Sequence, residues 1–159
     1  MPDMLVKLYE LPEYKPVAEH QKRAGIEVRR SIPPEKHIVL EWVLDNFYEH
    51  WVPQCDVAYS RQPCTCFIAI EDDELIGFAC YDVNAKGVFG PTGVAEAHRG
   101  KGIGTALLLA CLHDMLAQGY AYAIIGRVGP AEFYNKVIGA TLIEGSELGI
   151  FRGVLQRKE

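Results

Sequence analysis

The sequence predicts a mixed α/β fold, in which a central twisted sheet carries helices on both faces. Strand-like and helix-like segments alternate in the middle of the chain, and hairpin-like pairs of strands lie on either side. Such alternation favours parallel strand pairs, and hairpins add antiparallel ones. Residues 103–112 are apolar at nearly every position, which is typical of a helix enclosed by other elements.

Composition limits the class of protein. The chain has 159 residues, 49% hydrophobic and 23% charged, as expected of a globular domain with a sizeable core. A net charge of −5 argues against a nucleic-acid binder with a basic face. No apolar run approaches the ~20 residues of a membrane span, and residues 1–4 lack the features of a signal peptide. We therefore expect a cytoplasmic protein without nucleic-acid or membrane partners.

The five cysteines indicate neither disulfides nor a metal site. Cys64 and Cys66 lie two apart in a strand-like run, and that spacing is poor geometry for a disulfide. No pair of C-x₂-C motifs provides zinc ligands. Five reduced, mostly buried thiols and no bound metal are expected.

The first 25 residues are predicted to form an N-terminal extension, and residues 26–159 a single domain. Within the extension, residues 4–11 favour a short strand, and residues 12–24 favour a polar helix that ends at Gly25. We expect this extension to pack on the domain or on a partner subunit.

The domain then opens with a strand over 26–30, where polarity alternates with period two. Residues 31–35 carry prolines suited to a first helical turn. The helix that follows is predicted to run to about Tyr48, and residues 50–63 are predicted to be irregular. Its apolar stripe consists of Val39, Val43 and Phe47.

A hairpin is predicted from strands at 64–70 and 75–83, and a second turn leads into a third strand at 88–94. Pro91 lies inside that third strand, although proline cannot donate to a β-ladder. The sequence therefore predicts that the sheet splays there and leaves N–H groups unpaired near Thr92 to Val94.

A glycine loop follows, with the sequence Arg-Gly-Lys-Gly-Ile-Gly-Thr over residues 99–105. Glycines allow the backbone to approach a ligand, and a helix N-terminus offers free N–H groups. Phosphate or pyrophosphate is the expected guest. The spacing fits neither a P-loop nor the G-x-G-x-x-G dinucleotide fingerprint.

Beyond the loop, the apolar helix should end at Gly119, and a strand is predicted over 120–126. A short helix should open at Gly129-Pro130 and run through Val137. Segments 141–143 and 150–155 are predicted to form a final hairpin.

The pattern R-x-x-G-x-G, formed by Arg99, Gly102 and Gly104, resembles the coenzyme A pyrophosphate loop of the GNAT superfamily of acyltransferases. The lead-in over 94–99 also looks like that family. A second element, Phe-Tyr-Asn-Lys at 133–136 followed by Gly-Ala at 139–140, is similar to its "FYxK…GA/F" motif. The resemblance covers about 26–155 and implies a GNAT-like fold.

The resemblance implies an acetyl-CoA-dependent N-acetyltransferase that acts on a small-molecule amine. The main-chain N–H of Val94 would polarise the thioester carbonyl, and Tyr134 would protonate the departing thiolate. Glu96 is the nearest carboxylate to the splay and the candidate base, although its simpler interpretation is a solvated loop acid. For Tyr134 the simpler interpretation is a packed ring with a hydrated hydroxyl.

Coenzyme A is expected to contact the splayed strand, the glycine loop and Arg127. Arg127 stands where many relatives carry asparagine, so it would bind a cofactor phosphate or an acceptor carboxylate, or be an ordinary strand-end cation. The expected contact residues are Thr92, Val94, Arg99, Gly100, Lys101, Gly102, Ile103, Gly104, Thr105 and Arg127.

The acceptor is expected between the first helical region and the final hairpin, where acidic and aromatic residues suit a cationic or aromatic amine. These residues are Glu41, Asp45, Glu49, Asp56, Trp42, Phe47, Tyr48, Trp51 and Tyr59. Family habit and the extension suggest a homodimer. A non-catalytic acyl-CoA-binding module is the alternative, and a nicotinamide-binding oxidoreductase a third hypothesis.

Overall fold

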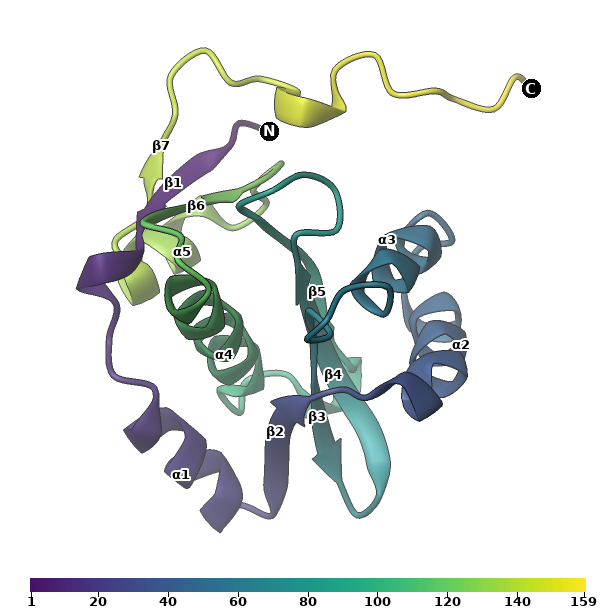
Figure 1. The fold of residues 1–159 in the computed structure, drawn as a ribbon, viewed down its shortest axis with the longest axis vertical. Coiled ribbons are helices and arrows are strands. Elements are labelled where there is room, and N and C mark those ends of the chain that lie inside the picture. The colour runs from purple at the N-terminus through teal and green to yellow at the C-terminus, as the bar shows by residue number, and fades with distance from the viewer.

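All 159 residues are described in the computed structural model, which is built on one seven-stranded mixed sheet (Figure 1). The strand order is β2-β3-β4-β5-β6-β1-β7. Only the β5–β6 pair is parallel. The strands are β1 (Met4–Lys7), β2 (Ile26–Arg30), β3 (Cys66–Glu71), β4 (Glu74–Tyr81), β5 (Val88–Val94), β6 (Tyr122–Ile125) and β7 (Thr141–Leu142).

Helices cover both faces of the sheet, as predicted (Figure 1). One buried cluster joins β1, β6 and the first group of helices, and a second joins β3, β4 and the other group. The first group comprises α1 (Lys15–Arg23), α4 (Ile103–Ala117) and α5 (Ala131–Ile138). The second comprises α2 (Lys36–Asn46) and α3 (Trp51–Ala58).

Helix α4 is the centre of the first cluster. Nine of its 15 residues are buried, because the helix lies between the sheet and α1. The prediction of an enclosed apolar helix is thereby confirmed. The α4 helix also fixes the loop at residues 99–102, which leads directly into its first turn.

The sheet splays at β5, as Pro91 predicted. Phe89 and Thr92 are three positions apart in β5, whereas their partners on β4 are only two positions apart, so β5 carries a bulge there. The Gly90–Pro91 peptide within this bulge is cis. Pairing between β5 and β6 is confined to the beginning of β5, at Val88 and Phe89. The rest of β5 therefore has no strand on its β6 side.

Two sequence predictions fail near the acceptor side. Residues 51–58 form helix α3 instead of irregular chain, because Pro53 lies in the first turn, where proline is tolerated. Residues 150–155 form no strand: Gly149–Phe151 is a 3₁₀ turn, and the chain beyond it carries no regular structure. The predicted final hairpin is therefore absent, and β7 pairs with β1 instead.

Residues 1–25 are part of the sheet and of its helical cover. Strand β1 lies between β6 and β7 and pairs with both in antiparallel fashion. Helix α1 packs against β2 and α4. The N-terminal segment therefore contributes a strand to the interior of the sheet, while 1–25 and 26–159 as domain bounds stay a prediction.

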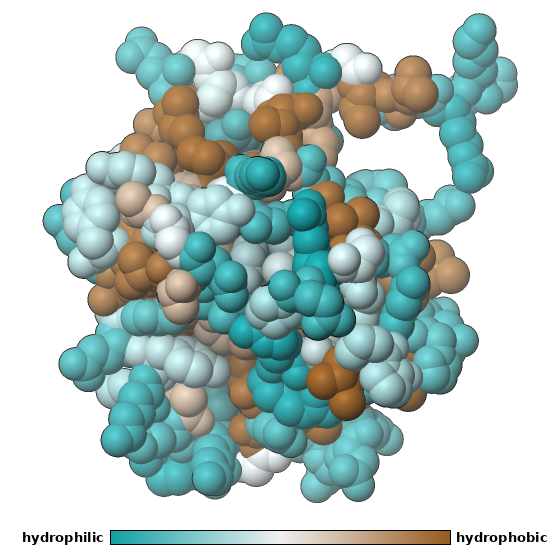
Figure 2. Space-filling model, viewed as in Figure 1, coloured by the Kyte–Doolittle hydropathy of each residue, from teal (hydrophilic) through white to brown (hydrophobic).

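The C-terminal segment carries exposed apolar side chains. Figure 2 shows brown, apolar residues gathered along the edge of the molecule where β7 and this segment lie. The exposed side chains are Leu142, Leu148, Ile150, Val154 and Leu155. One ion pair, between Arg157 and Glu49 at 3.2 Å, links the segment to the α2–α3 connection.

All five cysteines are free and buried, which agrees with the predicted placement of these thiols in the core. None of the helices is long and apolar enough to cross a bilayer.

Candidate functional site

The glycine loop presents a run of unpaired main-chain N–H groups. The N–H groups of residues 100–105 donate to no acceptor in the protein, and the first intrahelical bond runs from Ala106 N–H to Gly102 O at 3.1 Å. Gly100 and Gly102 have φ angles of +80° and +79°. These left-handed conformations turn the chain sharply into α4 and favour glycine. The loop thus offers an array of donors at the positive end of a helix dipole.

Two side chains fix the loop from within. Gln21 on α1 donates from Nε2 to the Lys101 carbonyl at 2.8 Å, and Arg99 donates from Nε to the Val94 carbonyl at 3.2 Å. Lys101 Nζ lies 3.5 Å from His98 Nδ1. Arg99 and Lys101 are both exposed, so the rim of the loop is cationic and open to an anion.

The splayed strand turns two main-chain groups toward the gap beside β5. Ala95 N–H donates to Ile76 O of β4 at 2.9 Å. Because alternate residues of an antiparallel strand direct their N–H groups to opposite sides, those of Thr92 and Val94 face away from β4. No β6 residue pairs with them. The Val94 N–H is therefore free to bind a ligand beside the loop, while the Val94 carbonyl accepts the hydrogen bond from Arg99 Nε.

Tyr134 lies in α5 with its ring buried and its hydroxyl free. The side chain is 8% exposed and packs edge-on against Phe133, with ring centroids 5.1 Å apart. The hydroxyl has no protein partner and is not among the buried unpaired polar atoms, so it reaches solvent. Burial raises the pKa of this phenol, which therefore keeps its proton and acts as a donor at neutral pH.

The other expected contacts differ in what they can offer. Ile103 is 1% exposed, so its side chain belongs to the core and only its main chain faces the loop. Thr105 is half-buried in the first turn of α4. Glu96 is exposed in the 3₁₀ turn after β5 and has no ionic partner. Gly104 has an ordinary φ, and a Cβ there would lie 3.8 Å from Val94 Cγ2.

Arg127 lies just beyond β6 and contacts Asp3 near the N-terminus and Phe151 in the C-terminal segment. Its N–H donates to Asp3 Oδ1 at 3.0 Å, and its guanidinium lies 5.6 Å from the centroid of the Phe151 ring. Its φ of +48° is in the left-handed region. Arg127 is exposed, so its charge is available at the end of β6.

Aromatic side chains from the α2–α3 region form a wall against the face of β5 that is turned toward these helices. Phe47 lies so close to Gly93 that a Cβ there would be 2.4 Å from Phe47 Cζ. Phe47 also stacks on Trp51 at 5.2 Å and meets Trp42 edge-on at 5.6 Å. Aromatic rings from the first helical region therefore stand one residue from Val94, on the side where the sequence predicts the acceptor.

The expected acidic residues are exposed, and two of them are paired. Asp56 lies 2.5 Å from Lys36, and Glu49 is the partner of Arg157. Glu41 and Asp45 have no ionic partner. Tyr48 is exposed and meets Trp51 edge-on at 5.2 Å.

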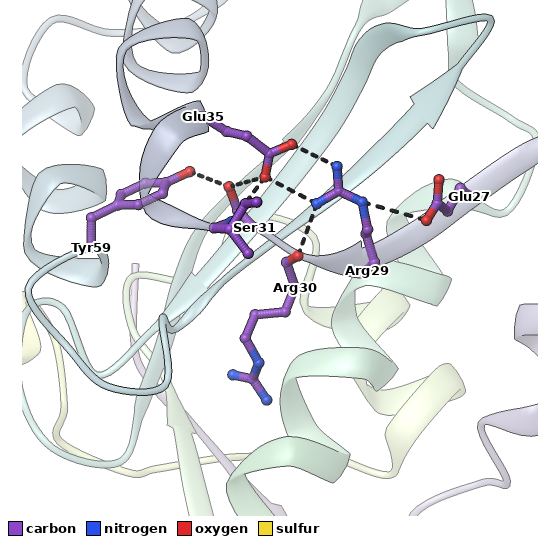
Figure 3. Close-up of polar contacts among 7 residues, drawn as sticks. Glu27, Arg29, Arg30, Ser31, Glu35 and Tyr59 are labelled. Carbon is purple, nitrogen blue, oxygen red and sulfur yellow. Dashed lines mark hydrogen bonds and ion pairs between the residues drawn. The ribbon is translucent and has the colours of Figure 1, made fainter.

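Tyr59 belongs to a structural network rather than to this acceptor region. Figure 3 shows its hydroxyl bonded to Ser31, which in turn contacts Glu35, the partner of Arg29. The Tyr59 ring is 8% exposed, and its burial raises its pKa. The sequence grouped this residue with the acceptor aromatics, but its ring is part of the buried cluster and its hydroxyl is bonded to Ser31.

Sequence reasoning missed Gln21, which holds the loop, and the close contact of Phe47 with Gly93. A signal existed for the first: Tyr14, Val17 and Gln21 share one face at helical spacing, so Gln21 continues an apolar stripe. The second depends on how two distant segments pack, and no local pattern encodes it.

The arrangement suits a diphosphate at the loop with an acyl group at the splay. Six free N–H groups and two cationic side chains are available to an anion, and no atom lies within 4 Å of the position of a Cβ at Gly100. The free Val94 N–H adjoins this loop through Arg99. These features fit coenzyme A, whose diphosphate and thioester require such donors at separate points.

Comparison with known proteins agrees with this chemistry. Residues 28–139 match the model of the acetyltransferase (GNAT) family. Among curated proteins, none matches the chain significantly.

Solved structures share the fold at low sequence identity. One is a GCN5-related glucosamine N-acetyltransferase region of a fungal multi-domain β-N-acetylglucosaminidase, with a TM-score of 0.73, 16% identity, and coverage of 89% of this chain and 19% of that one. Another is a GCN5-related N-acetyltransferase from Sphaerobacter thermophilus, with a TM-score of 0.67, 22% identity, and coverage of 89% and 48%. The chain thus spans less than half of either structure.

Proposed function

Since the chain belongs to the GNAT family of acetyltransferases, we propose that it transfers an acetyl group from acetyl-CoA to a primary amine of a small molecule. The observation that carries this proposal is the row of free N–H groups at residues 100–105, next to the end of a splayed strand. Every α-helix begins with four unpaired N–H groups. Here the loop adds those of Gly100 and Lys101, and such an array at a helix N-terminus suits a diphosphate.

The residues of the loop divide the work of holding coenzyme A. The main chain of 100–105 donates to the diphosphate, and Arg99 and Lys101 supply positive charge around it. Thr105 adds a hydroxyl in the first helical turn, and Arg127 is proposed to meet a further phosphate or an acceptor carboxylate. Bound acetyl-CoA supplies the activated thioester.

The splayed strand and α5 carry the acyl-transfer step. The Val94 N–H donates to the carbonyl oxygen as negative charge develops there, and the main-chain N–H of Thr92 faces the same gap. While the amine nitrogen forms its bond to the carbonyl carbon and the carbon–sulfur bond breaks, the Tyr134 hydroxyl gives its proton to the departing sulfur. Glu96 is proposed to take the proton that the amine releases.

The acceptor is proposed to enter beside the aromatic wall of Phe47 and Trp51. Glu41 and Asp45 add negative charge on the neighbouring α2 surface, and this combination favours a cationic amine. The homodimer that the sequence suggests stays a prediction.

One pair of substitutions tests the enzyme proposal. Tyr134→Phe should lower kcat about 10²-fold or more, because a proton donor is lost, with an unchanged coenzyme A affinity by calorimetry. Tyr122→Phe is the matched control, since Tyr122 is 48% exposed and its hydroxyl lies 3.3 Å from the exposed hydroxyl of Tyr9. Equal rates for the two variants would exclude Tyr134 as the acid.

The same experiment separates an enzyme from a binding module. Tight coenzyme A binding without turnover over a broad panel of amines would favour a non-catalytic acyl-CoA sensor. An absence of coenzyme A binding in the unmodified protein would reject both hypotheses.

A further inference from the structure

Helix α1 buries a single residue, and that residue is polar. Gln21 is 2% exposed, whereas the rest of α1 is exposed or half-buried. The helix lies against α4 at the end where the glycine loop begins. A glutamine in a core position needs an explanation, because burial removes its amide from water.

The amide of Gln21 sets the orientation of one peptide in the loop. Gln21 Nε2 donates to the Lys101 carbonyl at 2.8 Å and so holds that oxygen toward α1. The peptide between residues 101 and 102 is trans, so its N–H points opposite to its carbonyl. The Gly102 N–H is therefore turned away from α1, toward the outside of the loop.

Gln21 and the loop are in close contact at Gly102. A Cβ at residue 102 would lie 3.1 Å from Gln21 Nε2, and its φ of +79° excludes most side chains. If the peptide turned over, the Lys101 oxygen would face the anion and the array of donors would be interrupted. The contact thus keeps a carbonyl out of the loop's concave side.

The amide oxygen of Gln21 makes no favourable contact at this position. Its Oε1 is buried and has no hydrogen-bond partner. An unpaired buried acceptor lowers stability, so an apolar side chain of similar size would suit the fold at least as well. The value of the glutamine therefore lies in the shape of the loop.

We propose that Gln21 is a positioning residue for diphosphate binding, which fixes the Lys101–Gly102 peptide with its N–H outward. The residue lies outside the matched family segment of 28–139. This inference rests on the proposed coenzyme A site. It predicts that the N-terminal helix controls cofactor affinity without touching the cofactor.

Gln21→Met tests the inference, because methionine keeps the size and removes the amide. Gln118→Met is the matched control: the same change at the exposed end of α4, where the glutamine side chain has no partner. Calorimetry would measure coenzyme A and pantetheine, which lacks the diphosphate. Thermal unfolding and the NMR signal of the Gly102 amide without ligand complete the set.

For Gln21→Met we expect the coenzyme A Kd to rise about tenfold, as the loss of one good hydrogen bond allows. Binding of pantetheine should not change, and Tm should stay or rise. The Gly102 amide should shift or broaden, whereas Gln118→Met should leave every readout unchanged.

Unchanged coenzyme A affinity and an unchanged Gly102 signal in Gln21→Met would overturn the inference. A parallel loss of Tm and of both ligands would also overturn it, because that result describes a merely structural residue. If the unmodified protein binds no coenzyme A, the proposed function fails, and the ligand-free Gly102 signal still decides whether Gln21 orients the peptide.

Discussion

Substitution of the three loop glycines by alanine should give three different stabilities. Gly100 and Gly102 have φ angles near +80°, whereas Gly104 lies in the first turn of α4 with an ordinary φ. A Cβ at Gly100 would meet nothing within 4 Å, and at Gly104 it would make an ordinary contact with Val94 Cγ2 at 3.8 Å, but at Gly102 it would lie 3.1 Å from Gln21 Nε2. Backbone strain and steric contact can therefore be separated within five residues.

The magnitudes follow from these positions. Alanine in the left-handed region costs about 1–2 kcal/mol, so Gly100→Ala should be destabilised by that strain alone. Gly102→Ala should lose more, because the amide of Gln21 must also move. Gly104→Ala should gain up to about 1 kcal/mol, since alanine is a better helix former. The extremes should differ by about 2–3 kcal/mol, or about 4–12 °C in Tm for a domain of this size.

Urea unfolding and thermal scans of the three variants would measure this order. The expected ranking of stability is Gly104→Ala above the unmodified protein, then Gly100→Ala, then Gly102→Ala. Equal losses at all three positions would refute the assigned loop geometry, as would a Gly102→Ala variant as stable as the unmodified chain.

Two further predictions concern the surroundings of the site. A hydrogen bond from Arg29 lowers the pKa of Glu35 from 4.5 to about 2, so the pair stabilises the fold above pH 4.5 and loses this effect as the pH falls toward 2. The stability difference from Glu35→Gln, about 1 kcal/mol at pH 7 after solvent screening, should vanish in urea titrations near pH 2; a constant difference would contradict the pairing. Gly93→Ala should cost about 1–3 kcal/mol, because its Cβ displaces the Phe47 ring, and the added change Phe47→Leu should recover part of that loss in unfolding experiments.

Local patterns were sufficient for the elements that hold the proposed cofactor site. Pro91 marked the splay, and the glycines of residues 100–104 marked the loop, since both depend on backbone chemistry that a sequence displays. The enclosed helix α4 was evident from its apolar composition.

The pairing of strands that are distant in the sequence could not be predicted from such local patterns. Strand β1 pairs with β6 across more than 100 residues, and it also pairs with β7, for which the sequence predicted a partner at 150–155. No feature of residues 4–7 distinguishes a strand within the sheet from one beside it. The helix at 51–58 is missed for a different reason, because a proline such as Pro53 is tolerated in a first helical turn and does not by itself distinguish helix from irregular chain.

The central claim is that the main-chain amides of residues 100–105 grip a diphosphate. NMR titration of the ¹⁵N-labelled protein with coenzyme A tests it most directly. The largest shifts should fall on the amides of 100–105 and on Val94, and titration with pantetheine should spare the loop. Shifts centred elsewhere, or an unchanged spectrum at millimolar coenzyme A, would contradict the claim.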